Sequence, residues 1–123
     1  MAIDFSAIVE GNMLVVQTTG FDESLEQVLE YGLAVIHLSL QHGVTRVLCD
    51  ERELSYRLHT NDIYASAAFI AEQAPHLHKV AIVFDPQSIE DALFWETVAV
   101  NRGLQVRMFK ELDAAKAWLG SMQ

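Results

Sequence analysis

Short apolar runs alternate along this chain with longer segments in which apolar residues recur every three or four positions. The first pattern is typical of strands and the second of amphipathic helices. The opening stretch DFSAIVEGNMLVVQTTG predicts two strands joined at residues 10–12, where Gly11 and Asn12 both suit a positive φ. Three further strands are predicted at residues 46–50, 79–84 and 104–109.

Helix start and stop signals lie between these strands. Asp22 can cap a first helix that runs to about residue 42 and ends at Gly43. Thr60 or Asn61 can cap a second helix, which stops before Pro75. These signals predict two helices that flank the strand at 46–50.

The third and fourth helices follow the strand at 79–84. Pro86 suits a first helical turn, Ser88-x-x-Asp91 resembles a capping box, and Gly103 supplies a stop. A last helix is predicted over residues 112–119.

The resulting order is β-β-α-β-α-β-α-β-α, which predicts one α/β domain over residues 1–123. Alternation of strands and helices favours a mostly parallel sheet with right-handed βα crossovers. Residues 79–84 are almost continuously apolar, as in a central parallel strand that is buried on both faces.

Composition narrows the functional classes. The chain of 123 residues is 51% hydrophobic, enough for a core without metal or disulfide support, and its formal net charge is −9. An acidic surface disfavours nucleic acids and anionic lipid headgroups. The single cysteine, the absence of a signal-peptide pattern and the absence of a membrane-spanning apolar run predict a soluble cytoplasmic protein.

Few residues suggest chemistry. His76 and His78 form an H-x-H step, but no third ligand follows at a diagnostic spacing, and Cys49 lies within a predicted core strand. We therefore expect no metal, no cofactor and no catalytic residue. Asp50 and Asp85 end two predicted strands, at the edge where α/β sheets bind ligands, and are weak site candidates.

The helices carry more apolar surface than one small sheet needs. We expect the first helix to turn Leu40 toward the core, and the third helix to turn Leu93 and Val100 there. The remaining large apolar side chains of the second and third helices would then form a subunit interface or line a pocket, unless neighbouring helices cover one another. These side chains are Tyr64, Phe69, Phe94, Trp95 and Val98.

The chain resembles the SpoIIAA-like family of the STAS (sulfate transporter and anti-sigma factor antagonist) superfamily. The resemblance spans nearly the whole chain and rests on four stretches, VEGNMLVVQTTG, TRVLCDER, KVAIVFD and VRMFKELDAAKAWL. It implies a single SpoIIAA-like domain that binds proteins rather than catalysing a reaction.

The resemblance also implies a site in the loop before the second helix. Anti-sigma factor antagonists carry an acidic-Leu-Ser-aromatic stretch and then Asp-Ser-Ser-Gly, whose second Ser is phosphorylated. The matching residues here are 53–56, with Ser55 as the serine, and then Leu58, His59, Thr60 and Asn61. Thr60 falls on the phosphoacceptor position, although the preceding Asp is replaced. The alternative is that Thr60 only caps its helix, in a former switch region.

Two functions from different classes remain open. The first is a non-enzymatic STAS-like binding or regulatory module, a homodimer that acts through an apolar helix surface. The alternative is a carrier or sensor of a small lipophilic ligand held between the second and third helices, by analogy with the similar architecture of lipid-binding CRAL-TRIO domains.

Overall fold

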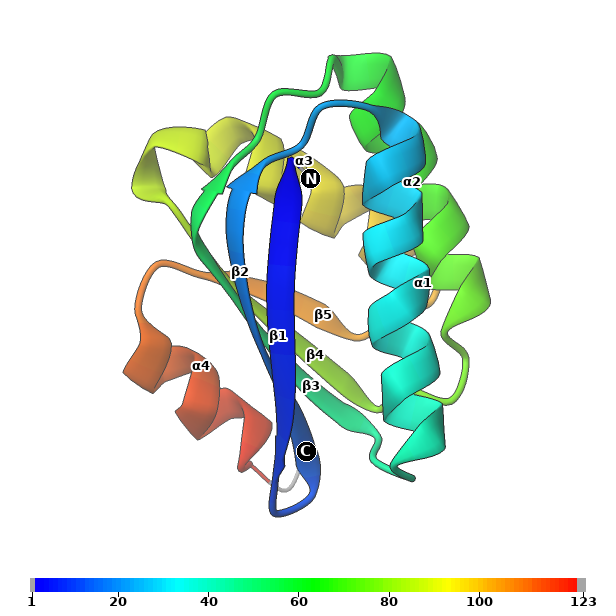
Figure 1. Ribbon diagram of the computed structural model, residues 1–123, viewed down its shortest axis with the longest axis vertical. Coiled ribbons are helices and arrows are strands. Elements are labelled where there is room, and N and C mark those ends of the chain that lie inside the picture. The colour runs from blue at the N-terminus through cyan, green and yellow to red at the C-terminus, as the bar shows by residue number, and fades with distance from the viewer. Residues whose placement is uncertain (1, 122–123) are drawn as a thin grey trace.

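The computed structural model describes residues 2–121 and contains one five-stranded sheet flanked by helices (Figure 1). The elements within these residues are β1 (Ile3–Glu10), β2 (Met13–Phe21), α1 (Leu25–Gln41), β3 (Arg46–Ser55), α2 (Thr60–Gln73), β4 (Lys79–Phe84), a short 3₁₀ helix (Pro86–Ser88), α3 (Ile89–Asn101), β5 (Val106–Phe109) and α4 (Leu112–Leu119). The strands lie in sequence order, with β1 antiparallel to β2 and all other pairs parallel. The predicted order and the mostly parallel sheet are confirmed.

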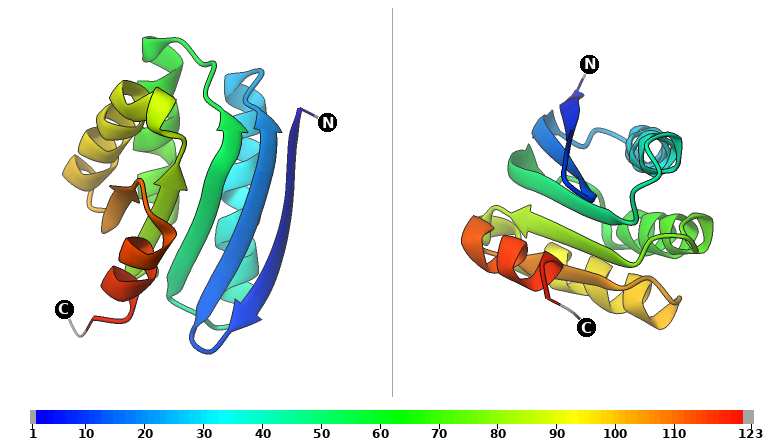
Figure 2. Two further views of the ribbon diagram at one scale, coloured as in Figure 1. Left: turned by 90° about the vertical axis from the view of Figure 1, so that its left-hand side faces the viewer. Right: turned by 90° about the horizontal axis from the view of Figure 1, so that it is seen from below.

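The two faces of the sheet carry separate hydrophobic cores. Helices α1, α2 and α3 cover one face and α4 covers the other (Figure 2). Along β4, Val80 and Ile82 pack with α1–α3, whereas Ala81 and Val83 pack with α4. Because side chains alternate along a strand, this division confirms that β4 is buried on both faces.

A buried lysine ties α4 to the sheet. The Lys79 Nζ donates hydrogen bonds to the carbonyl oxygens of Trp118, at 2.9 Å, and Ser121, at 3.1 Å. These carbonyls lie at the C-terminal end of α4, where the negative end of the helix dipole favours a cation. The first residue of β4 therefore anchors the helix that covers the second face.

The start of α1 differs from the prediction. Ser24 is its N-cap, and the Ser24 hydroxyl accepts a hydrogen bond of 3.3 Å from the Gln27 backbone N–H. Asp22 does not cap the helix, because its carboxylate accepts the backbone N–H of Arg57 instead. Asp22 thus connects two loops that are distant in sequence.

The predicted cap of α2 and the predicted capping box of α3 are also wrong. His59, not Thr60 or Asn61, occupies the N-cap of α2, and its side chain makes no capping hydrogen bond. Ser88 is the N-cap of α3 but likewise makes no side-chain capping bond, so no capping box forms. Asp91 lies in the first turn of α3, where its negative charge interacts favourably with the positive end of the helix dipole. This interaction does not need a capping hydrogen bond.

Glycines end the predicted segments as expected. Gly11 has a φ of 61° in the turn between β1 and β2, and Gly43 and Gly103 have φ values of 66° and 98° after α1 and α3. Asn12 has no positive φ, contrary to the prediction.

Two strand boundaries differ from the prediction. β3 does not end at Asp50 but continues to Ser55, because residues 53–55 pair with residues 19–21 of β2 after a register shift. β5 begins at Val106 rather than at residue 104. The polar segment expected as a loop after β3 is therefore largely strand.

The buried faces of α1 and α3 also differ from the prediction. Leu40 of α1 is 56% exposed, and Leu93 and Val100 of α3 are 46% and 47% exposed. α3 buries Ala92, Val98 and Ala99 instead. Small alanines allow the helix to approach its neighbours closely, which periodicity in a helix that is apolar on several sides does not reveal.

Candidate functional site

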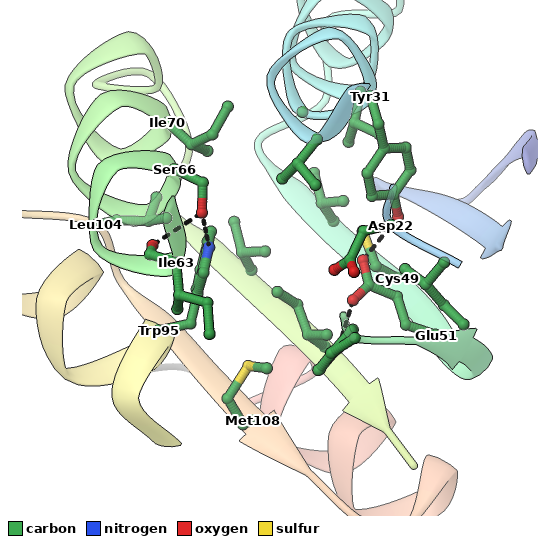
Figure 3. A pocket seen from close by; sticks show the side chains of 18 of the residues that line it. Asp22, Tyr31, Cys49, Glu51, Ile63, Ser66, Ile70, Trp95, Leu104 and Met108 are labelled. Atoms are coloured by element: carbon green, nitrogen blue, oxygen red, sulfur yellow. Dashed lines mark hydrogen bonds between the residues drawn. The ribbon is translucent and has the colours of Figure 1, made fainter. Parts of the chain in front are cut away.

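A cavity of about 120 Å³ lies between the sheet and helices α1, α2 and α3. Figure 3 shows side chains from both layers directed toward it. Most of its wall is apolar and includes Val28, Ile63, Ile70, Ile82, Leu104 and Met108. Ala74, the C-cap residue of α2, also contributes to the lining. The cavity therefore has a mostly apolar wall with contributions from three helices.

One end of the cavity carries a buried carboxylate held by phenols. Glu51 accepts hydrogen bonds from the hydroxyls of Tyr31, at 2.8 Å, and Tyr56, at 2.5 Å. The Thr18 hydroxyl lies 2.7 Å from the Tyr31 hydroxyl. Because the Tyr31 proton points to Glu51, Thr18 donates to the Tyr31 oxygen. The hydroxyl groups thus form a chain of donors that ends on Glu51.

Burial has the largest effect on the pKa of Glu51. It raises the pKa of Glu51, an effect that the hydrogen bonds from Tyr56 and Tyr31 oppose and that the nearby carboxylate of Asp22 reinforces. Burial also raises the pKa of Tyr31 and Tyr56 well above the ordinary value, so both phenols stay protonated. These phenols can therefore donate to Glu51 over the whole physiological pH range.

Cys49 lines the cavity beside Glu51, two residues earlier on the same face of β3. Burial first, and then the charge of Glu51, raises the pKa of the Cys49 thiol. A thiol that stays protonated is a poor nucleophile and a poor metal ligand.

Asp22 and Asp91 are the other acidic residues of the lining. Asp22 is 7% exposed, and burial raises its pKa, with a further contribution from the charge of Asp91. Its hydrogen bond from the Arg57 backbone fixes the loop between β3 and α2, whose residues Tyr56 and Leu58 line the cavity. The Asp22 carboxylate therefore also holds this part of the cavity wall in place.

Trp95 and Ser66 lie at the other end. The Trp95 indole Nε1 donates a hydrogen bond of 3.1 Å to the Ser66 hydroxyl, which donates to the carbonyl oxygen of Ile63 at 2.9 Å (Figure 3). The indole N–H is thus satisfied inside an apolar wall, and the ring is held between α2 and α3.

The five apolar residues predicted as one interface or pocket occupy different places. Trp95 lines the cavity, Val98 is buried and Phe94 packs partly buried against the core. Tyr64 and Phe69 are 46% and 38% exposed on α2. The structure therefore divides this set between the interior and the outer face of the helices.

Tyr64 is engaged within the chain. Its hydroxyl accepts a hydrogen bond of 2.6 Å from Arg102, whose guanidinium lies 5.7 Å from the centre of the Tyr64 ring. This contact joins α2 to the end of α3.

The predicted polar site residues lie outside the cavity. Asp50 is buried within β3 and pairs with Arg52, with an Oδ2 to Nη2 distance of 2.6 Å, and this hydrogen bond lowers the pKa of Asp50. Ser55 is exposed at the end of β3, and Asp85 caps the 3₁₀ helix by accepting from the Gln87 N–H at 3.1 Å. Thr60 is exposed as the first residue of α2. Neither Asp50, Ser55, Asp85 nor Thr60 contributes to the lining.

Sequence reasoning missed Glu51, Tyr31 and Asp22. A signal for Glu51 was present, since it lies two positions after Cys49 and side chains two apart share one face of a strand. Placing residue 51 in a loop concealed this alternation. For Tyr31, which lies 20 residues away from Glu51, no local pattern identifies the partner.

Residues 2–121 contain neither a metal-binding cluster nor a membrane-spanning helix. In that part of the chain, no group of three or more His, Cys, Asp and Glu side chains is arranged to hold a metal ion. No helix there is both long and apolar enough to cross a membrane.

The mixed five-stranded sheet, with α1–α3 on one face and α4 on the other, defines a SpoIIAA-like α/β fold. The model of the SpoIIAA-like family matches residues 11–120, so the chain belongs to the SpoIIAA-like family of the STAS superfamily. The resemblance stated from the sequence is confirmed. No curated protein matches the chain.

A solved structure supports the same fold. It is an uncharacterized protein of the DUF3478 family with a SpoIIAA-like fold from Shewanella loihica PV-4. The two are 18% identical, with a TM-score of 0.52 over 96% of this chain and 94% of that one. At this identity the similarity concerns the fold alone.

Proposed function

We propose that the protein is a non-enzymatic carrier or sensor that binds a small lipophilic molecule in the cavity between the sheet and α1–α3. The observation that carries this proposal is the apolar cavity of about 120 Å³. An apolar cavity of about 150 Å³ in another protein stays dry and binds benzene. The proposed ligand is therefore the size of a single ring with few additional atoms, smaller than a long-chain lipid.

The lining groups support binding rather than catalysis. The raised pKa of Cys49 leaves little thiolate for nucleophilic attack, and Glu51 already accepts two phenolic hydrogen bonds. A carboxylate has about four lone-pair sites, so the two phenols leave Glu51 able to accept a further donor from a ligand. We accordingly propose that the residues around the cavity hold a ligand without transforming it.

Toluene is a suitable probe, and Trp95 can report its binding. The chain contains two tryptophans, and the other, Trp118, packs on the α4 side of the sheet. In a Trp118→Phe protein, we expect toluene to change the Trp95 fluorescence in a saturable manner and to raise the melting temperature. Native mass spectrometry of gently purified protein would report any molecule retained from the host.

Two substitutions in α1 provide a matched control. Val28 lines the cavity, whereas Leu33 is 39% exposed. Val28→Phe should fill the cavity and abolish the toluene response, and Leu33→Phe should leave it intact. A Trp118→Phe protein that is folded but does not respond to toluene would contradict the proposed function.

A second candidate function is a protein-binding module that acts through the outer side of α2 and α3. The observation that favours it is the exposure of three large apolar side chains there, Phe69, Leu93 and Val100. Exposed apolar surface of this kind often marks an interaction site. We propose a second copy of this single-domain chain as the partner. We also propose that the protein lies in the cytoplasm, because its one cysteine is a free thiol, which suits a reducing compartment.

A further inference from the structure

We infer that the cavity selects a small lipophilic amine, with its ring against the apolar wall and its ammonium group at Glu51 and Asp22. This inference rests on the proposed function and specifies the class of ligand. It follows from the polarity of the lining, the burial of the carboxylates and the size of the cavity.

The titratable lining is acidic, with no basic side chain. Asp22, Glu51 and Asp91 contribute to the wall, and no Lys, Arg or His is among the lining residues that the structure describes. Figure 3 shows Asp22 and Glu51 together at one end of the cavity, beside Tyr31 and Cys49. A ligand with a carboxylate or a phosphate would be repelled from this end, whereas a cation would be attracted.

The two carboxylates lack a cationic partner. Asp22 and Glu51 are each 7% exposed, and neither forms an ion pair with a Lys or Arg within residues 2–121. Their hydrogen bonds come from the phenols of Tyr31 and Tyr56 and from backbone N–H groups, which include that of Arg57. Burying a charge is costly unless an opposite charge accompanies it. An ammonium group would supply that charge.

The surrounding groups suit an ammonium ion in two further ways. Its three N–H donors can meet the oxygens of Glu51 and Asp22, and the same wall contains the aromatic side chains of Tyr31 and Tyr56, a residue type that attracts cations. The formal net charge of −9 also attracts cations to the protein from solution. A neutral alcohol could donate one hydrogen bond to these carboxylates but would lack the positive charge.

Size completes the definition of the ligand. A cavity of about 120 Å³ holds a ring and a short substituent. Benzylamine fits this description, and benzyl alcohol and benzoate share its ring but carry a neutral and an anionic head. These three compounds therefore isolate the charge of the head group.

The test is the affinity of each compound, measured by isothermal titration calorimetry and by Trp95 fluorescence in the Trp118→Phe protein. We expect benzylamine to bind at least about tenfold more tightly than benzyl alcohol, because an ion pair with the carboxylates replaces a hydrogen bond from a neutral hydroxyl. Benzoate should bind most weakly. In Glu51→Gln, the affinity for benzylamine should fall by about tenfold, while that for benzyl alcohol changes less than about threefold.

Asp50→Asn is the matched control, because Asp50 is a buried carboxylate of the same strand that pairs with Arg52 outside the cavity. It should leave the benzylamine affinity unchanged. The ratio of benzylamine to benzyl alcohol in the unsubstituted protein decides the question even if Glu51→Gln does not fold. Equal affinities, or a preference for benzyl alcohol, would overturn the amine class and leave the proposed function standing. Failure of toluene and of all three compounds to bind would overturn the proposed function itself.

Discussion

Glu51 concentrates the chemistry of this protein in one side chain. Its carboxylate lies in the interior, where burial opposes ionisation, and two phenols partly compensate by donating hydrogen bonds. The ionisable groups around it come from several parts of the chain: Asp22 before α1, Tyr31 on α1, Cys49 and Asp50 on β3, and Tyr56 after β3. The stability of the fold is therefore linked to the protonation of Glu51.

We predict that Glu51→Gln changes how stability depends on pH. Because the pKa of Glu51 is raised above 4.5, the folded protein binds this proton more tightly than the unfolded chain does. Between pH 4.5 and the raised pKa, the free energy of unfolding should fall as pH rises, by at most about 1.4 kcal/mol per pH unit. Urea unfolding from pH 4.5 upward should show that the free energy of unfolding falls less with pH in Glu51→Gln than in the unsubstituted protein.

Asp50 provides a contrast for this experiment, since Arg52 lowers its pKa below 3.8. The stability that its ionised form contributes is present above pH 3.8 and lost as pH falls through the lowered pKa. Asp50→Asn should therefore alter the pH profile only on the acidic side. A profile of Glu51→Gln that is parallel to that of the unsubstituted protein would show that Glu51 has the same pKa in both states.

At the scale of elements, α1 and α2 approach each other closely beside the cavity. Gly32 of α1 faces Ile70 of α2, and both line the cavity. A Cβ at position 32 would overlap the Cδ1 of Ile70 and lie 3.0 Å from its Cγ1. Glycine thus lets the two helices approach closely without displacing the Ile70 side chain, although it is unfavourable in a helix interior.

We predict that Gly32→Ala lowers the free energy of unfolding through this overlap. Overpacking costs about 1–3 kcal/mol, whereas alanine gains about 1 kcal/mol in helix propensity. In an Ile70→Val background, which lacks the Cδ1 atom, the same substitution should be neutral or stabilising. Urea unfolding of the four proteins completes a double-mutant cycle. Equal costs of Gly32→Ala in both backgrounds would show that Ile70 is not the side chain it displaces.

The bounds of the strands and helices also show which elements the sequence predicts correctly. The predicted strand at 79–84 and the predicted helix at 112–119 have the same bounds as β4 and α4. A continuous apolar run and a short amphipathic segment each indicate one type of element clearly. β3 was predicted too short, since pairing of residues 53–55 with β2 extends it. The inner face of α3 was mistaken because apolar residues surround that helix and only its neighbours decide which of them are buried.

At the scale of the whole molecule, the outer side of α2 and α3 bears on the oligomeric state. Phe69 and Leu93 are exposed there, whereas Ile8, which is 58% exposed, lies on β1 at the other edge of the sheet. A substitution of Trp95 would not test this surface, because Trp95 lines the cavity and its indole donates a hydrogen bond to Ser66.

We predict a homodimer that Phe69→Asp or Leu93→Asp converts to a monomer with an unchanged fold. Burying a carboxylate in an apolar contact should raise the dimer dissociation constant by at least about thirtyfold. Native mass spectrometry measures the subunit number, and Ile8→Asp is the control that should remain dimeric. A monomeric unsubstituted protein, or a monomer produced only by Ile8→Asp, would rule out this surface as the interface.

The sequence by itself determined the order of the elements, the glycine ends of α1 and α3, the doubly buried β4 and the membership of the SpoIIAA-like family. These properties depend on periodicity and on local backbone preferences, which neighbouring residues encode. Only the tertiary structure decided that Tyr31, Glu51 and Tyr56 meet, that Asp22 joins them, and that Trp95 faces inward while Leu93 faces outward. Those contacts join residues up to 35 positions apart, and the packing of the layers, rather than any local pattern, brings them together.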